Sequence, residues 1–156
     1  MTRSQEEKQR LFHPDVTVAV VVPRDGRLLL VEERVRGALV LNQPAGHVEP
    51  GETLAEAAVR ETREETGWDV ALTYLIGAYR WDAPDGIAFL RFAFAAEALL
   101  HHPAQPLDTG IERALWLSPE ELRAANGRAR SPLVLAVVDD WLAGARLPLC
   151  ALRDIA

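Results

Sequence analysis

Residues 46–68 read GHVEPGETLAEAAVRETREETGW, and this stretch carries the strongest information on the fold of the chain. The turn residues Pro50-Gly51 precede Thr53, which is a good N-cap, and Glu56 completes a capping box three residues later. A helix should therefore start at about Thr53. Gly67 is expected to end it, because glycine commonly follows the last helical residue. The sequence thus predicts a short helix whose two ends are specified locally.

Three glutamates near the end of this helix break local rules. Glu61 is an i,i+3 neighbour of Glu64 and an i,i+4 neighbour of Glu65, so each like-charge pair costs about 0.2–0.5 kcal/mol. Glu64 and Glu65 also lie in the last turn, where the helix dipole disfavours each carboxylate by about 0.3–1 kcal/mol. A chain that breaks local rules without visible compensation most often marks a functional site. A divalent cation is the simplest compensation, and we expect the three glutamates to be metal ligands.

The overall charge of the chain points to the same cation. The 156 residues include 17 Lys+Arg and 23 Asp+Glu, which gives a formal net charge of −6. An acidic protein that acts on an anionic substrate needs metal ions to reconcile the two charges. Mg²⁺ suits carboxylate, water and phosphate oxygens, and Mn²⁺ accepts the same donors. The basic residues are scattered along the chain, so we expect no nucleic-acid polymer as a partner.

Seven positions of the stretch fit the pattern G-x5-E-x7-R-E-x-x-E-E-x-G. They are Gly46, Glu52, Arg60, Glu61, Glu64, Glu65 and Gly67. Coincidence of seven such residues has a probability on the order of 10⁻⁸ per starting position. The pattern resembles the signature box of the Nudix hydrolase family. Two positions depart from it: Thr62 stands where the family usually has an aliphatic residue, and Trp68 where a smaller apolar residue is more common.

The resemblance implies roles for several acidic and basic residues. Arg60 adjoins Glu61 and lies four residues before Glu64, so its planar guanidinium can hold a carboxylate in a fixed orientation. In this family the general base is either a box glutamate or a carboxylate from a later loop. Glu112, with Asp108 nearby, is the favoured loop candidate. The alternative is Glu61, acting as both ligand and base.

Candidate substrate contacts lie at the start of the box and outside it. They are Gly46, Asn42, Gln43, Arg80, Trp81 and Arg91. Arginine grips phosphate with two hydrogen bonds, and tryptophan offers a π face to a stacked ring. Gly46 permits a loop that folds back over the helix. We expect these residues to surround a small phosphorylated molecule.

The apolar runs outside the box predict mainly strands. Val16–Val22 and Arg27–Glu33 flank strong turn residues and should pair as an antiparallel hairpin. Val70–Tyr79 and Ile87–Ala96 predict a second hairpin. Further expected elements are a strand at 39–43, a surface loop at 101–110, a strand at 113–117, a short helix capped by Ser118, and a helix from Ser131 through Ala143 with Leu135, Val138 and Leu142 on its apolar face.

Length and composition indicate one domain. We expect an N-terminal tail at 1–12 and a single domain at 13–156, and the single cysteine excludes an internal disulfide framework. The elements fit an α+β class, and the resemblance implies the Nudix α/β/α sandwich, a mixed central sheet with the box helix on one side and the C-terminal helix on the other. The absence of an apolar leader or membrane span predicts a cytoplasmic protein. We expect it to be a monomer or a homodimer.

Five stretches outside or next to the box resemble a branch of bacterial phosphatases within the family: residues 16–22, 42–47, 83–85, 89–92 and 130–134. This implies Mg²⁺-dependent release of orthophosphate from nucleoside di- and triphosphates and from hydroxymethylpyrimidine pyrophosphate. One alternative is pyrophosphohydrolysis of a nucleoside diphosphate linked to another group, such as ADP-ribose. A second is a Nudix module that senses a nucleotide without cleaving it. Such modules usually lose a box carboxylate or gain a DNA-binding domain, and this chain does neither.

Overall fold

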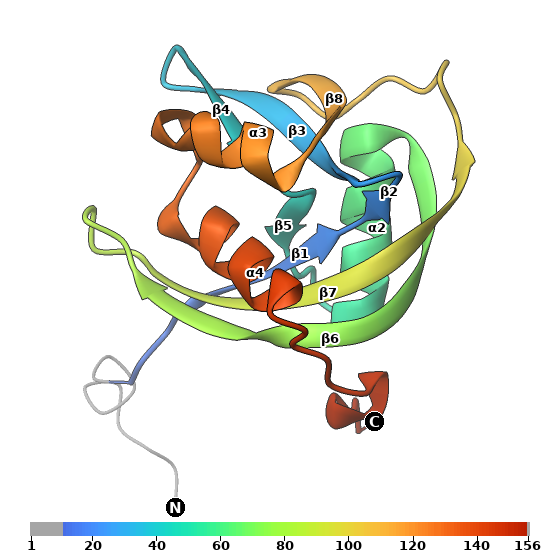
Figure 1. The fold of residues 1–156 in the computed structure, drawn as a ribbon. Helices are drawn as coiled ribbons and strands as arrows, with labels where there is room; N and C mark the ends of the chain where they lie inside the picture. The colour runs from blue at the N-terminus through green and yellow to red at the C-terminus, as the bar shows by residue number, and fades with distance from the viewer. Residues whose placement is uncertain (1–10, 156) are drawn as a thin grey trace, which may run out of the picture.

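The computed structural model describes residues 11–155, so most of the predicted tail at 1–12 lies outside the described residues. Within these residues the structure has two four-stranded sheets and three α-helices (Figure 1). The elements are β1 (Asp15–Val21), β2 (Pro23–Arg24), β3 (Arg27–Val35), β4 (Ala38–Asn42), β5 (Ala45–His47), α2 (Leu54–Thr66), β6 (Trp68–Asp82), β7 (Ala88–His101), β8 (Ile111–Leu117), α3 (Pro119–Ala124), α4 (Pro132–Leu142), and the short 3-10 helices η1 (Asn126–Arg128) and η2 (Leu149–Ala151).

The first sheet has the strand order β5-β1-β7-β6. Strand β1 pairs with β5 in antiparallel fashion and with β7 in parallel fashion, which makes the sheet mixed. The hairpin predicted between Val70–Tyr79 and Ile87–Ala96 is confirmed as β6 and β7, and both strands extend further than predicted. Figure 1 shows this long hairpin curving around one side of the molecule.

The predicted hairpin between Val16–Val22 and Arg27–Glu33 is wrong. The turn forms at Asp25-Gly26, where both residues have positive φ, but the pairing that follows it is limited to the two-residue strand β2 and one bond from the N–H of Leu29 to the carbonyl of Val22. Strand β3 belongs to the second sheet, between β4 and β8. Strand β1 is buried from Thr17 onward, and it therefore takes a central position between β5 and β7 in the first sheet.

Helices α2 and α4 cover opposite faces of the first sheet, as the α/β/α arrangement requires. Along β7, Phe94 and Ala96 join the core that contains Ala57 and Ala58 of α2. The alternate residues Ala93 and Ala95 join a second core that contains α4. Because successive side chains of a strand point to opposite faces, the two helices lie on the two sides of the sheet.

The box helix forms as its sequence predicts. Thr53 accepts from the backbone N–H of Glu56, whose side chain accepts from the N–H of Thr53, and Gly67 ends the helix with φ 74°. In α4 the predicted apolar face is partly wrong, because Leu142 is exposed. The buried residues of α4 are Leu133, Val134, Val137 and Val138.

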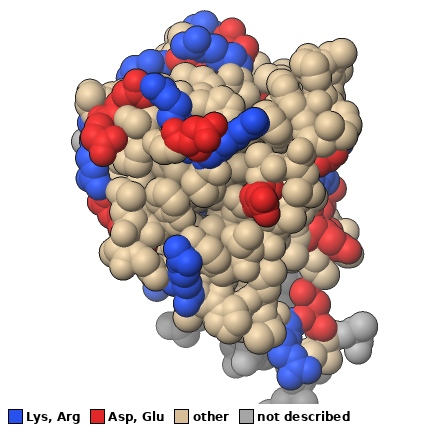
Figure 2. All heavy atoms as spheres, turned by 45° about the vertical axis from the view of Figure 1, so that its right-hand side comes forward, with Lys and Arg blue, Asp and Glu red and all other residues tan. Residues whose placement is uncertain are grey.

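No helix in the described part of the chain is long and apolar enough to cross a membrane. On the face drawn in Figure 2, several acidic and basic side chains lie side by side, and much of the central surface is uncharged. The cytoplasmic location, the oligomeric state and the exclusion of nucleic-acid polymers stay predictions.

Candidate active site

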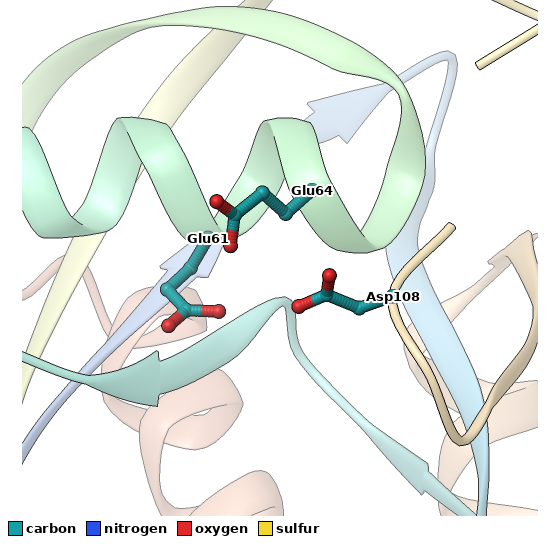
Figure 3. Close-up of side chains that lie close together, drawn as sticks. All are labelled: Glu61, Glu64 and Asp108. Atoms are coloured by element: carbon teal, nitrogen blue, oxygen red, sulfur yellow. The ribbon is translucent and has the colours of Figure 1, made fainter. Parts of the chain in front are cut away.

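Three carboxylates meet at the C-terminal half of α2. One carboxylate oxygen from each of Glu61, Glu64 and Asp108 lies within 4.8 Å of the others. Figure 3 shows Glu61 and Glu64 projecting from the helix and Asp108 reaching toward them from the loop between β7 and β8. The structure therefore brings together two of the three glutamates expected as ligands, and it adds an aspartate to them.

Hydrogen bonds between this loop and the end of α2 position Asp108. The backbone N–H of Asp108 donates to the carbonyl of Glu64 at 3.1 Å, and the N–H of His102 donates to the carbonyl of Gly67 at 2.8 Å. Between them, Gln105 donates to the carbonyl of Arg63 at 2.7 Å and accepts from its guanidinium. These contacts fix the loop on backbone carbonyls at the C-terminal end of α2 and at its C-cap.

Arg60 holds the acidic side chains around it in fixed positions. Its guanidinium makes two parallel hydrogen bonds to Glu52, with Nε to Oε2 at 2.9 Å and Nη2 to Oε1 at 2.6 Å. Nη1 donates to Glu61 at 2.9 Å and to Glu64 at 3.1 Å, and Nη2 also donates to the carbonyl of His47 at 3.0 Å. The pKa of Arg60 is raised, chiefly by Glu52. The guanidinium thus links the box loop to two carboxylates of the cluster.

Gly46 allows β5 to approach the carboxylate of Glu61 closely. A Cβ atom at Gly46 would lie 2.1 Å from both Cδ and Oε1 of Glu61. Any side chain at this position would therefore displace the carboxyl group of Glu61.

Glu65 lies deeper in the protein than Glu64. Its Oε2 accepts from the backbone N–H of Ala45 at 3.0 Å, which ties α2 to β5. Burial raises the pKa of Glu65 to about 9, and burial also raises the pKa of Glu61 against the lowering effect of Arg60. Of the three expected metal ligands, Glu65 is the one outside the carboxylate cluster of Glu61, Glu64 and Asp108.

This donor set fits a hard divalent cation. All three groups offer carboxylate oxygen, which Mg²⁺, Mn²⁺ and Ca²⁺ prefer. Because position 46 is a glycine, no Cβ atom occupies the space beside the carboxyl group of Glu61. The cluster can therefore hold a metal ion, and its chemistry alone does not select among these cations.

Glu112, the favoured base candidate, lies on β8 and forms an exposed ion pair with Arg34 at 2.8 Å. It is not part of the carboxylate cluster, whereas Asp108 is. The sequence placed the two acidic residues near each other, but only the contacts of the loop with α2 show which of them reaches the glutamates.

A pocket of about 440 Å³ adjoins the cluster at Gly46. Of the six residues expected to contact substrate, four line it: Asn42, Gly46, Trp81 and Arg91. The Trp81 ring stacks on Phe89, also a lining residue, with centroids 5.6 Å apart. The pocket therefore has an aromatic wall, and it also reaches Gly46, the residue that lies against the carboxyl group of Glu61.

The other two expected contacts serve elsewhere in the structure. Gln43 is buried and donates to the backbone carbonyl of Val134 at 2.7 Å, which ties the end of β4 to α4. Arg80 is exposed, pairs with Asp82 at 3.1 Å and lies over the ring of Phe12. Thr17 and Ser131 line the pocket without having been expected there. The sequence marked Ser131 only as the start of a helix and Thr17 only as part of a strand.

Comparison with known proteins identifies a family and similar proteins. Residues 11–137 match the family model described as the NUDIX domain. The phosphatase NudJ of Escherichia coli strain K12 is 45% identical over 144 residues, which cover 92% of this chain and 94% of that protein. The protein of the same name in Shigella flexneri is equally similar.

Solved structures show the same fold. A NUDIX hydrolase from Nitrosomonas europaea superposes with a TM-score of 0.90 at 46% identity, over 92% of this chain and 98% of that chain. A MutT NUDIX hydrolase from Burkholderia pseudomallei gives a TM-score of 0.70 at 23% identity, over 83% and 98% of the two chains, and so supports the fold alone. With the complete box and the domain match over most of its length, the chain belongs to the Nudix hydrolase family.

Proposed function

We propose that this protein is a Mg²⁺-dependent hydrolase of phosphoanhydride bonds in small molecules. The chain is similar to the phosphatase NudJ. In this proposal it releases orthophosphate from nucleoside di- and triphosphates and from hydroxymethylpyrimidine pyrophosphate. The observation that carries the proposal is the cluster of Glu61, Glu64 and Asp108, which stands beside a pocket large enough for a small organic group.

In this proposal the box residues hold the cation and keep its ligands oriented. Glu61, Glu64 and Glu65 supply the ligand oxygens, and Arg60 is a positioning residue that acts through Glu52, Glu61 and Glu64. Bound there, Mg²⁺ would neutralise charge on the phosphoryl oxygens and lower the pKa of the attacking water. The protein's own contribution is a rigid arrangement of oxygens that needs little reorganisation during the reaction.

Asp108 is the proposed general base. Its carboxylate reaches the cluster, and it accepts no hydrogen bond from any side chain in the described part of the molecule. Arg60, by contrast, holds both Glu61 and Glu64. Glu112, preferred on the sequence, is engaged by Arg34 on β8. Glu61 remains the alternative base, because its carboxylate borders the same space.

The substrate's organic part enters the pocket between the two sheets in this proposal. Trp81 and Phe89 offer it a stacking surface, and Asn42 offers it a polar group. Gly46 forms the boundary between this pocket and Glu61, which lets the anhydride lie across β5.

The proposal is tested with a panel of phosphorylated metabolites incubated with Mg²⁺ and analysed for all products. Orthophosphate supports the phosphatase, whereas paired monophosphates from an ADP-ribose type substrate would replace it with a pyrophosphohydrolase. Glu64→Gln should lower kcat/KM by at least about 100-fold, since metal ligation supplies several kcal/mol of transition-state stabilisation. Glu56→Gln on the same helix is the matched control and should keep near-normal turnover. No turnover of any diphosphate with Mg²⁺ or Mn²⁺ would refute the function.

A further inference from the structure

Unpartnered polar atoms concentrate in the pocket beside the carboxylate cluster. Six buried side-chain atoms of the described residues have no hydrogen-bond partner: Oγ1 of Thr17, Oδ1 of Asn42, Oε1 of Gln43, Nε and Nη1 of Arg91, and Oγ of Ser131. All except the Gln43 oxygen belong to residues that line the pocket. Buried polar groups are nearly always hydrogen-bonded, so such a concentration calls for a ligand.

Arg91 is the most costly of these groups to leave unpartnered. The residue is only 7% exposed, and its guanidinium forms no hydrogen bond or ion pair within residues 11–155. Burial lowers the pKa of Arg91 to about 10, so it remains charged at neutral pH. A buried charge without a partner is strongly unfavourable. The protein therefore keeps Arg91 charged at a cost that a bound anion would offset.

Glu33, an acidic residue of the pocket, already pairs with another arginine. Its Oε1 accepts from Nε of Arg130 at 2.8 Å. Glu33 and Glu65 act to raise the pKa of Arg91 and Arg130 acts to lower it, but neither carboxylate forms an ion pair with Arg91 in the described part of the chain. Three arginines and two acidic residues line the pocket: Arg36, Arg91 and Arg130 against Glu33 and Asp85.

The start of α4 adds to this environment. Ser131 is the N-cap of this 11-residue helix, yet its hydroxyl caps no backbone N–H and has no other partner among the described residues. Both Ser131 and Leu133 of the first turn line the pocket. Helix N-termini favour negative charge, and a free serine hydroxyl can donate to an anion. The hydroxyl of Thr17, across the pocket on β1, can do the same.

We propose that Arg91, Ser131 and Thr17 form a receptor for a phosphate monoester group, carried by the part of the substrate that leaves when the terminal phosphate is hydrolysed. This inference rests on the proposed function for the identity of the ligand. Removing orthophosphate from a diphosphate ester leaves a doubly charged monoester, and Gly46 places the receptor pocket next to the carboxylate of Glu61. Arg91 then selects substrates with at least two phosphates: the terminal phosphate, which is released, and a second phosphate that stays on the organic group.

The test is binding to the complete protein without metal, measured by calorimetry in the presence of a chelator. The probes are inorganic phosphate and adenosine 5′-monophosphate, with adenosine as the uncharged comparison. Wild type should bind both phosphate-bearing probes more tightly than adenosine. Arg91→Met should weaken their binding by about 10- to 100-fold, the range expected for hydrogen bonds to a charged group, and leave adenosine unaffected. Arg80→Met, at an exposed arginine of β6 outside the pocket, should change nothing.

Thermal unfolding of the same variants separates binding from folding. Arg91→Met should unfold no earlier than wild type, because it removes an unpaired buried charge, and added phosphate should raise the unfolding temperature of wild type but not of this variant. Absence of phosphate binding to wild type, or equal binding to Arg91→Met, would overturn the receptor. So would a variant that unfolds well below wild type and is unaltered in phosphate binding.

The outcomes for the receptor and for the hydrolase are independent. Phosphate binding that depends on Arg91, in a protein that hydrolyses no diphosphate, would refute the proposed function and support the anion receptor. Metal-dependent hydrolysis that is unchanged in Arg91→Met, together with no phosphate binding to wild type, would support the proposed function and refute the anion receptor.

Discussion

Arg60 contacts the carboxylate cluster, Arg91 lines the pocket next to the cluster, and the two arginines have opposite surroundings. Arg60 donates to three carboxylates and a backbone carbonyl, so every edge of its guanidinium is engaged by the protein itself. Arg91 is more deeply buried and has no partner among the described residues. The first arginine fixes the geometry of the protein's own ligands, and the second leaves its hydrogen-bonding capacity for a molecule from outside.

The difference teaches how the site divides positioning from recognition. A carboxylate cluster needs its repulsions balanced before the cation arrives, and Arg60 does this through Glu52, Glu61 and Glu64. A recognition pocket gains affinity from buried polar groups that have no partner until the ligand binds. Binding then supplies their hydrogen bonds and removes the cost of leaving them unpaired. The predictions below change one side of this comparison at a time.

The largest effect is expected at Asp108, the member of the cluster that Arg60 does not hold. Asp108→Asn should lower kcat by about 10²–10⁴-fold, the usual contribution of a general base. Glu112→Gln should change kcat by less than about twofold, because it breaks only an exposed ion pair with Arg34. Parallel pH profiles of both variants decide the matter. An inactive Glu112→Gln beside an active Asp108→Asn would return the role to Glu112.

Gly46→Ala should have the next largest effect. Its methyl group would occupy the position of the Glu61 carboxyl, and a displacement of about 1 Å in a catalytic group can cost about 100-fold in rate. Since the displaced atoms are the end of a flexible side chain, the unfolding temperature should fall little. Gly127→Ala is the matched control, because a Cβ there meets nothing within 4 Å. Normal turnover of Gly46→Ala would show that Glu61 can act from another position.

Arg60→Ala should weaken metal binding by about 10- to 100-fold, as loss of an orienting partner typically does. It should also destabilise the protein, in contrast to Arg91→Met, because Glu52 and Glu61 would lose the guanidinium that balances their charge. Manganese binding followed by electron paramagnetic resonance, together with urea unfolding, measures both quantities. Arg60→Lys should restore part of the affinity. Unaltered metal affinity in Arg60→Ala would leave Arg60 a purely structural residue.

The smallest effect concerns acid stability away from the site. Glu32 accepts from Arg113 and Arg128, and these contacts hold its pKa below the ordinary value. The stabilisation is therefore complete above the pKa of the unfolded state and is lost as pH falls through the lower folded value. Glu32→Gln should be less stable than wild type at pH 7, and the gap should close in acid. Urea unfolding at several pH values measures this, and a constant gap would contradict it.

The box helix could be predicted because its signals are local. A capping box, a terminal glycine and a clash of three glutamates all lie within the helix or at its ends, and α2 forms with these boundaries. The long hairpin of β6 and β7 was also predictable, since its strands are neighbours in sequence. The pairing of β1 with β3 was wrong because turn chemistry fixes a reversal of the chain but not which strands share a sheet.

By itself, the sequence determined the family, the helix that carries the glutamates and the kind of cation that suits them, because these follow from residue types at short spacing. Only the tertiary structure decided that Asp108 joins Glu61 and Glu64 and that Arg91 lies buried without a partner. Both depend on contacts between segments far apart in the chain: a loop fixed on the end of α2, and a strand enclosed by β1 and the start of α4. Burial and pairing are properties of such packing, and no local pattern of residues encodes them.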